Sequence, residues 1–364
     1  MDFVAVGYPG YLAAWGFQFL EAALRRLAPG LPVLHLDRFD VPEDIGRHPG
    51  ARLILSLFPN PEFARTCEER HIPAVVFVDD VFEAVQHVRR QHGISTVEAL
   101  RPVTAGMVLA GRIARAPQSL MIGRDTADAT PRLLAALAAF LGLDVSNEHV
   151  QKMCRQLGAE GLALETALRR QSAGASASAE LTDDDKDMIV QVLGGLREHL
   201  VQPTPGDVTW PRQCFLVGDR PDASAPVALE VTGRARIIYY GPYFHLPRGM
   251  WKVRMSVGFS QDIRGMPFSI DVYSTDLLGR ARIFADRGGI FSVEFEAVVT
   301  ASHEPIEVRI MNEQGAIEGH MGLVGIDFTH WRPHPDDLQA RLPPSSTQEH
   351  GLPSARLPAS ALQG

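Results

Sequence analysis

Gly7-Tyr8-Pro9-Gly10-Tyr11-Leu12-Ala13-Ala14-Trp15 is the stretch that decides the fold of the first half of the chain. It follows the short apolar run Phe3–Val6, which is typical of a buried strand. Apolar residues at helical spacing come after it, namely Phe17, Leu20, Leu24 and Leu27. A strand, a Gly/Pro turn and a helix form the geometry in which free N–H groups of a helix N-terminus cradle a phosphate. The turn holds no lysine, serine or threonine, so it predicts the backbone of an anion site without its usual side chains.

Continuous apolar runs alternate with helical stretches from this loop to about Gln202. The runs that we interpret as further strands are Pro32–Leu36, Ala51–Leu57, Ala74–Val78 and Ser119–Ile122. One helix is predicted to begin at Pro131 and to stop at Gly142, and another runs from an N-cap at Thr182 to about Leu200. Apolar strands with helices between them predict a parallel sheet covered on both faces, which is an α/β domain.

The pattern of predicted elements changes after Pro203–Pro211, a segment with three prolines that we interpret as a linker. Eight strand-like runs follow at short spacing: 227–231, 234–240, 250–259, 268–273, 281–284, 290–297, 306–311 and 322–328. Short strands separated by Gly/Pro/Asp turns, without a long helix, predict an all-β jelly roll or β-sandwich. The predicted organisation is an α/β domain over 1–201, a linker over 202–213, a β-sandwich over 214–332 and a disordered tail over 333–364.

The composition narrows the classes of partner. The chain has 364 residues and a net charge of −8, and it has no basic stripe, so a general nucleic-acid partner is not expected. No secretory leader pattern and no apolar run of about 18 residues occur, which predicts a cytoplasmic protein without a transmembrane segment. A protein partner within a polysaccharide assembly stays open.

No metal site is predicted. The three cysteines, Cys67, Cys154 and Cys214, are too far apart in sequence for a metal knuckle and suggest no disulfide framework. Asp183, Asp184 and Asp185 form an acidic cluster, but it falls in the first turn of a predicted helix. Favourable interaction with the helix dipole explains that cluster without a metal.

The opening loop resembles that of the sulfotransferase family. The family's loop reads Tyr-Pro-Lys-Ser-Gly-Thr-Thr-Trp and binds the 5′-phosphosulfate of 3′-phosphoadenosine-5′-phosphosulfate. The residues at the corresponding cofactor-binding positions here are Tyr8, Pro9, Gly10, Tyr11, Ala13, Ala14 and Trp15. Tyrosine, proline and tryptophan match, whereas Gly10 stands in place of the lysine and Ala13 and Ala14 in place of the threonines.

Three further landmarks follow in the family's order. Leu57 stands where the family's second strand carries its catalytic histidine, and Asp79 and His87 stand where an arginine and a serine bind the 3′-phosphate. Leu120–Asp125 and Phe140–Leu143 are similar to later segments of the family. The resemblance implies a P-loop sulfotransferase-like fold over residues 3 to about 200.

The charges at these positions argue against the family's usual cofactor. Asp79, Asp80 and Glu83 would face a phosphate, and a buried like charge costs several kcal/mol. Each ~1.4 kcal/mol is a tenfold loss of affinity, so we expect no cofactor. 3′-Phosphoadenosine-5′-phosphosulfate is expected only if the divergent site is active. Asp79 and His87 are then the weak catalytic candidates, as an acid–base pair at a strand end. The alternative is a helix N-cap at Asp79 or Asp80 and a solvent-facing His87.

The β half resembles modules appended to bacterial glycosyltransferases and other surface-polysaccharide proteins, which look like carbohydrate-binding modules. The segment that carries the resemblance is Gly241–Val253, continued by Phe268–Val272. The glycan-binding candidates are Tyr240, Tyr243, His245, Arg309 and Glu318. Tyr239 and Tyr240 should point to opposite faces of their strand, so only one of them can lie in the core. Trp251 is predicted to be a core residue.

The resemblances imply a divergent, non-catalytic sulfotransferase-like protein with a glycan-recognising β module, acting in the biosynthesis or modification of bacterial surface polysaccharide. Whether the chain is an enzyme stays open. One alternative is an active sulfotransferase, or another sugar-directed transferase, with a non-standard site. The other is a structural adaptor whose two domains make only protein contacts.

Overall fold

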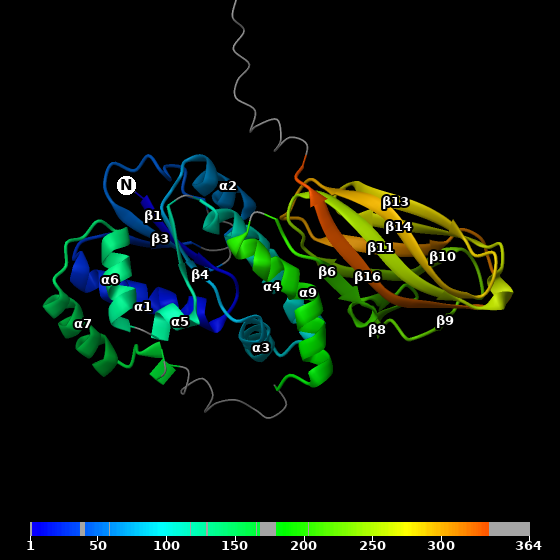
Figure 1. The fold of residues 1–364 in the computed structure, drawn as a ribbon, viewed down its shortest axis with the longest axis horizontal. Helices are drawn as coiled ribbons and strands as arrows, with labels where there is room; N and C mark the ends of the chain where they lie inside the picture. The colour runs from blue at the N-terminus through cyan, green and yellow to red at the C-terminus, as the bar shows by residue number, and fades with distance from the viewer. Residues whose placement is uncertain are drawn as a thin grey trace, which may run out of the picture.

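The computed structural model describes residues 2–36, 41–57, 59–116, 118–128, 130–164, 166–167, 180–202 and 204–334. Of the tail predicted over 333–364, only residues 333 and 334 fall in these ranges, and the rest lies outside the described residues. The chain forms a parallel sheet with helices in its first half and two antiparallel sheets in its second half (Figure 1).

The first sheet has the strand order β2-β3-β1-β4-β5 and is parallel throughout. Its strands are β1 (Asp2–Gly7), β2 (Val33–His35), β3 (Arg52–Ser56), β4 (Ala74–Phe77) and β5 (Ser119–Ile122). The strands predicted at Phe3–Val6, Leu53–Leu57, Ala74–Val78 and Leu120–Ile122 therefore share one parallel sheet, as expected. The central strand, β1, is buried along its whole length.

Helices cover both faces of this sheet. One layer consists of α1 (Tyr11–Leu27), α6 (Thr130–Phe140) and α7 (Asn147–Ala159), with the short α5 (Arg124–Asp128) beside it. The other consists of α2 (Pro61–Glu69), α3 (Val81–His92), α4 (Thr96–Ala114) and α9 (Asp183–Val201). Side chains alternate along β1, so Phe3 and Ala5 pack with the first layer and Val4 and Val6 with the second.

Local sequence signals set the helix ends. The predicted N-cap of α9 is confirmed, because the Thr182 side chain accepts a hydrogen bond from the Asp185 N–H within a capping box. Ser95 and Glu98 form the same arrangement at the start of α4. Asp80 caps α3 by accepting from the N–H groups of Phe82 and Glu83.

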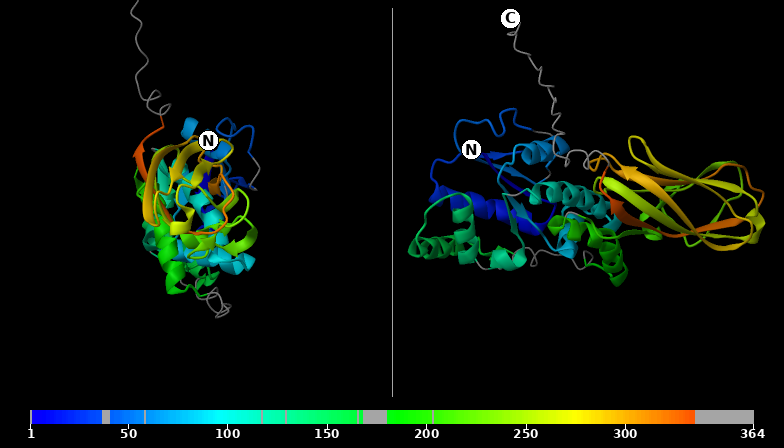
Figure 2. Two further views of the ribbon diagram at one scale, coloured as in Figure 1. Left: turned by 90° about the vertical axis from the view of Figure 1, so that its right-hand side faces the viewer. Right: turned by 45° about the horizontal axis from the view of Figure 1, so that its top comes forward.

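The second half forms two antiparallel sheets, as predicted. The six-stranded sheet has the order β13-β12-β15-β10-β7-β8, and the other has the order β14-β11-β16-β6 with β9 beside β16. The strands are β6 (Val208–Pro211), β7 (Leu216–Val217), β8 (Arg220–Ser224), β9 (Leu229–Glu230), β10 (Arg236–Phe244), β11 (Gly249–Phe259), β12 (Pro267–Tyr273), β13 (Leu277–Phe284), β14 (Gly289–Val299), β15 (Ile306–Asn312) and β16 (His320–Arg332). Figure 2 shows the two sheets from two further directions.

The segment predicted as a linker over 202–213 is not wholly a linker, because it contains β6. This strand pairs with β16, and Trp210 at its centre is fully buried. The Trp210 ring lies 4.2 Å from that of Phe328 and 5.7 Å from that of Phe244. The β-sandwich therefore begins upstream of residue 214, and a fragment starting there would lack a central core side chain.

Two helices join the halves. In Figure 1, α4 and α9 lie between the parallel sheet and the β-sandwich, and their buried residues belong to one apolar cluster with those of the sandwich. Arg101 donates from Nε to the Pro242 carbonyl at 3.0 Å, and the His245 N–H donates to the Thr104 hydroxyl at 3.3 Å. Gly195 of α9 allows close approach, since a Cβ there would lie 2.3 Å from the Asp207 carbonyl oxygen.

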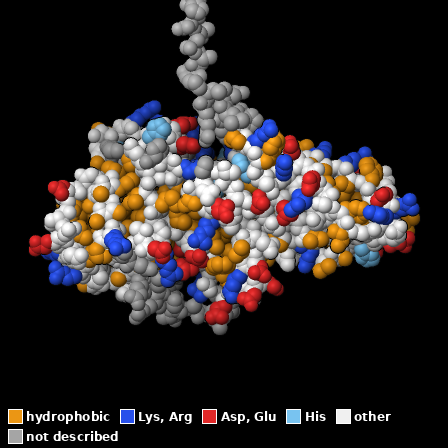
Figure 3. All heavy atoms as spheres, viewed as in Figure 1, with side chains coloured by type: hydrophobic (Ala, Val, Ile, Leu, Met, Phe, Trp, Pro, Cys, Tyr) orange, Lys and Arg blue, Asp and Glu red, His pale blue; other side chains and the backbone are white. Residues whose placement is uncertain are grey.

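The surface carries charges of both signs. On the face drawn in Figure 3, acidic and basic side chains are interspersed over the β-sandwich. Among the helices that the structure describes, none combines the length and the apolar character that crossing a bilayer requires.

Candidate functional site

The loop after β1 lies against a carboxylate that comes from the end of β4. Gly10 precedes α1 in an extended conformation, with φ −173° and ψ 170°, and no side chain of the loop caps the helix. Instead the Leu12 N–H donates to Oδ2 of Asp79 at 2.6 Å. Asp79 follows β4 at the same edge of the sheet and is only 4% exposed. A negative group from the chain itself therefore lies at the helix N-terminus.

Gly10 is required by this arrangement. A Cβ built at residue 10 would lie 2.1 Å from Oδ2 of Asp79, so any side chain there collides with the carboxylate. Gly10 and Asp79 are thus one structural unit. The chain places an internal carboxylate at the N-terminus of α1 and leaves the space for it.

Tyr8 holds the backbone of Asp79 in place through a hydrogen bond. Its ring is fully buried, and its hydroxyl donates to the Asp79 carbonyl oxygen. Burial, with the charge of Asp79 as a second cause, raises the pKa of Tyr8 well above its ordinary value. Helix α4 packs closely on the loop at Gly106, where a Cβ would lie 2.7 Å from that of Tyr8. The loop is therefore held on both sides by packed residues.

Burial also changes the acidity of Asp79. Desolvation raises its pKa to about 7, and the hydrogen bond from the Leu12 N–H acts in the opposite direction. The nearby charge of Glu83 raises the pKa further. The site therefore favours the neutral form of the Asp79 carboxyl more than water does.

The structure shows different contacts for the two members of the predicted acid–base pair, Asp79 and His87. The Asp79 carboxylate accepts from the Leu12 N–H at 2.6 Å. His87 on α3 instead packs edge-on against Tyr11, with ring centroids 6.3 Å apart. It is half-buried rather than solvent-facing, and burial lowers its pKa. The N-cap alternative is confirmed for Asp80, which caps α3, whereas Asp79 accepts from the first turn of α1, whose N-cap is Gly10.

Ala13 and Trp15 of the loop are buried in the core of the α/β domain. Ala13 is fully buried, and Trp15 is 3% exposed and stacks on Phe19 with ring centroids 5.0 Å apart. The Trp15 indole N–H donates to the Leu162 carbonyl at 3.0 Å. The tryptophan shared with the sulfotransferase loop therefore anchors α1 to the segment after α7.

The structure brings three of the five glycan-binding candidates together. Tyr240 lies opposite Arg309 on the neighbouring strand, and the Tyr240 and Tyr243 rings meet edge-on at 6.3 Å. Glu307 joins them by accepting from the Tyr243 hydroxyl at 2.9 Å and pairing with Arg309 at 2.5 Å. Tyr239 is fully buried and Tyr240 half-buried, and Trp251 is in the core, all as expected.

Two tyrosine rings in this region, those of Tyr243 and Tyr273, make cation–π contacts with arginines. The Arg101 guanidinium lies 5.3 Å from the Tyr243 ring centroid, and that of Arg309 lies 4.2 Å from the Tyr273 ring centroid. Tyr243 is therefore a junction residue under α4. Cross-strand register identifies Glu307 and Tyr273, whereas Arg101 comes from the other domain and no pattern in the sequence indicates it.

The other two candidates lie elsewhere. His245 is at the junction, where its N–H donates to Thr104 and its ring contacts the His303 carbonyl at 3.2 Å. Glu318 is exposed in the turn between β15 and β16, at the opposite end of the sandwich. The five residues predicted to bind glycan thus occupy three places.

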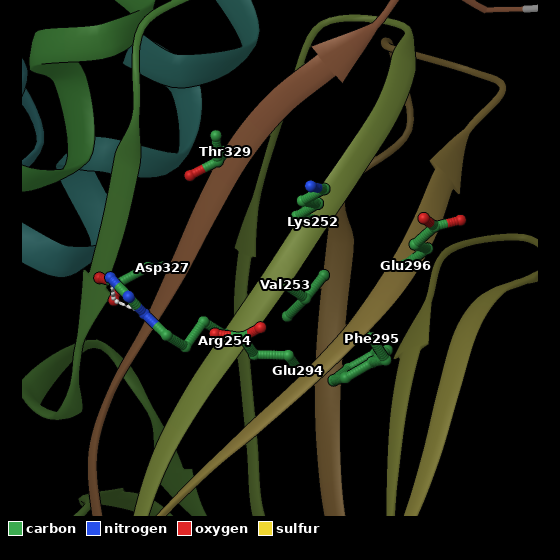
Figure 4. Close-up of a pocket in the computed structure, with 8 residues that line it drawn as sticks. All are labelled: Lys252, Val253, Arg254, Glu294, Phe295, Glu296, Asp327 and Thr329. Atoms are coloured by element: carbon green, nitrogen blue, oxygen red, sulfur yellow. Dashed lines mark hydrogen bonds and ion pairs between the residues drawn. The ribbon is translucent and has the colours of Figure 1, made fainter.

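A hollow of about 390 Å³ lies on the outer face of the antiparallel sheet that contains β11, β14 and β16 (Figure 4). Its polar lining residues are Lys252, Arg254, Glu294, Glu296, Asp327 and Thr329. They come from three neighbouring strands, β11, β14 and β16. Sequence analysis missed all six, although the alternation of charged and apolar residues along β11 places Lys252 and Arg254 on one face. Within the described ranges, no group of three His, Cys, Asp or Glu side chains could hold a metal ion.

Comparisons with known proteins give likenesses of fold. Neither protein-family models nor curated proteins match the sequence. Among solved structures, a mouse sulfotransferase complexed with PAP has 16% identity and a TM-score of 0.33, and covers 42% of this chain. The match spans 63% of the length of that sulfotransferase.

The other similar structures include carbohydrate-binding modules. One, solved with β-1,4-galactotriose, has 8% identity and a TM-score of 0.24, covering 34% of this chain and 88% of that module. The C-terminal module of a laminarinase from Zobellia galactanivorans has 14% identity and a TM-score of 0.23, covering 34% of this chain and 99% of that one. Function is therefore argued below from this chain's own residues.

Proposed function

We propose that this protein is a non-catalytic, sulfotransferase-like scaffold joined to a glycan-recognising β-sandwich, and that it serves in the biosynthesis or modification of bacterial surface polysaccharide. In this proposal the α/β domain positions the β-sandwich and transfers no group. The glycan is held by the β-sandwich alone, with the weak affinity of a site made of a few side-chain contacts.

The position of Asp79 is the observation that carries the first half of the proposal. Its carboxylate accepts from the Leu12 N–H at 2.6 Å, so the donor that would meet a phosphate oxygen already has a negative partner. A phosphosulfate entering this place would meet a like charge in a dry site, at a cost of several kcal/mol. Leu57, at the position of the family's base, cannot accept a proton.

The proposal is tested by titrating the whole chain with 3′-phosphoadenosine-5′-phosphosulfate in a calorimeter at pH 7.5. We expect no binding at millimolar nucleotide. Asp79→Ala, which removes the competing carboxylate, serves as the comparison, and its binding should be at least as strong as that of the parent. A micromolar dissociation constant for the parent chain would show that the loop is a working cofactor site.

A second candidate is a transferase that uses Asp79 as a general base. The pKa of this side chain, about 7, is the value that suits a base at neutral pH. Its enclosure argues against that role, because a base must reach the proton that it removes and Asp79 is 4% exposed. Sugar-dependent release of adenosine 3′,5′-bisphosphate by the parent chain, abolished in Asp79→Asn, would favour this candidate.

A further inference from the structure

The hollow in Figure 4 is lined by two carboxylates, Glu294 and Glu296, that make no ion pair within the part of the chain that the structure describes. Glu294 and Glu296 project from the same face of β14, directly opposite Arg254 and Lys252 of β11. Opposite charges on neighbouring strands usually form cross-strand ion pairs, which here would join each glutamate to the cation across from it. Instead neither glutamate has a hydrogen-bond or ion-pair partner among the described residues.

Arg254 and Lys252 make contacts with residues other than the two glutamates. Arg254 bonds Oδ2 of Asp327 with both Nε and Nη2, each at 3.2 Å. The Lys252 ammonium lies 5.4 Å from the Trp331 ring centroid. The donors therefore come from the middle strand, β11, and acceptors without a partner among the described residues stand on β14. This leaves hydrogen-bonding capacity that the protein does not use internally.

The outer face of the six-stranded sheet differs, because three of its arginines are paired with carboxylates of the protein. Arg280 pairs with Asp271 at 2.6 Å, Arg282 with Glu313 at 2.5 Å and Arg309 with Glu307 at 2.5 Å. Tyr243 and Tyr273 of that face lie under arginines. A ligand there would have to break existing pairs, whereas a ligand in the hollow would not.

The charges of the hollow restrict its ligand. Three carboxylates repel an anionic ligand, and the interleaved Lys252 and Arg254 oppose a metal cation. A neutral polyhydroxylated molecule fits, since each hydroxyl both donates to a carboxylate and accepts from an ammonium or a threonine hydroxyl. The volume of about 390 Å³ falls within the usual size of small-molecule sites.

We infer that this hollow is the saccharide site of the β-sandwich, and that it binds uncharged sugar residues through Glu294, Glu296 and Lys252. The inference rests on the proposed glycan-binding function and gives it a location and a ligand class. Recognition is by hydrogen bonds to hydroxyls rather than by stacking, because the Trp331 ring lies against Lys252 and Arg332. This differs from the stacking expected at Tyr240 and Tyr243.

The test compares three forms of the full chain on an array of neutral, uronate-containing and sulfated oligosaccharides. They are the parent, the double variant Glu294→Gln/Glu296→Gln, and Tyr240→Ala as the matched control on the opposite sheet. Both glutamates are exposed, so the double variant should keep the parent's melting temperature. We expect the parent to bind neutral glycans preferentially, the double variant to lose at least tenfold in affinity, and Tyr240→Ala to bind like the parent.

Three results would overturn the inference. Loss of binding in Tyr240→Ala, with the double variant unaffected, would place the site on the six-stranded sheet and leave the glycan function standing. Preference for uronate or sulfated glycans, or binding that requires Ca²⁺, would contradict the ligand class. A parent chain that binds no glycan at all would refute the glycan function and this site together.

Discussion

At the scale of single residues, Gly10 and Asp79 explain each other. Sequence analysis identified both as departures from the sulfotransferase pattern and predicted from the charges of Asp79, Asp80 and Glu83 that the cofactor would not bind. It could not place one against the other, because they come from different strand ends 69 positions apart in the numbering and meet only when β1 and β4 pair. The candidate pair of Asp79 and His87 was likewise inferred from positions in the sequence, which do not reveal that the Leu12 N–H donates to the carboxylate.

The enclosure of Asp79 predicts a pH dependence of stability. Its pKa is about 7 in the folded protein, against 3.8 as the ordinary value, so the folded state holds this proton more tightly. The resulting stabilisation is complete below the unfolded pKa and is lost as pH rises through about 7, on the order of 4 kcal/mol in total. Asp79→Asn, whose amide oxygen still accepts from Leu12, should remove this slope. Urea unfolding at pH 5 and pH 8 measures it, and Asp184→Asn, at an exposed side chain of α9, should leave it unchanged. Equal slopes in the parent and in Asp79→Asn would show that the carboxylate is not enclosed.

At the scale of elements, most strands could be predicted from the sequence, whereas β6, β7 and β8 could not. The parallel strands, α6, α9 and the eight later strands all follow from hydrophobic periodicity. Strand β6 was hidden because prolines surround it and only four residues pair. Its tertiary context, Trp210 between Phe244 and Phe328, overrides the local turn signals.

Strand β6 should therefore contribute strongly to stability through Trp210. We expect Trp210→Ala in the full chain to lower the free energy of unfolding by about 3–5 kcal/mol, the usual cost of removing a large buried aromatic side chain. Ile317→Ala is the control, because that side chain is 94% exposed and its loss should change stability by less than about 0.5 kcal/mol. Chemical denaturation followed by circular dichroism gives both values. A loss below 1 kcal/mol for Trp210→Ala would show that this segment is a linker after all.

At the scale of the whole molecule, one apolar cluster extends from the parallel sheet through α4 and α9 into the β-sandwich. Sequence analysis divided the chain into two domains, because a proline-rich segment separates a pattern of alternating strands and helices from a pattern of closely spaced strands. The joining surface is instead formed by helix faces far from that segment, including Arg101 and Thr104. We therefore expect the full chain to unfold in a single transition.

His199 makes this junction sensitive to acid. Burial, with the charge of Arg115, lowers its pKa to about 3, so the unfolded chain binds the proton more readily. Stability from this group is complete above its ordinary pKa of 6.5 and is lost as pH falls toward 3, on the order of 5 kcal/mol. His199→Gln should flatten the decline between pH 6.5 and pH 4 in urea unfolding. His35→Gln, at a side chain that is 61% exposed, should not. A His199 that titrates near 6.5 by nuclear magnetic resonance would contradict this expectation.

The most direct test of the central claim is the nuclear magnetic resonance signal of the Leu12 amide in the full chain. Its ¹⁵N shift would be followed from pH 5 to pH 9, with and without millimolar adenosine 3′,5′-bisphosphate. If the Asp79 carboxylate occupies the helix N-terminus, the amide shift follows the titration of Asp79, with a midpoint near 7, and the nucleotide leaves it unchanged. An amide that is insensitive to pH and moves with the nucleotide, saturating at micromolar concentration, would show that this loop binds phosphate and that the domain is not a closed scaffold.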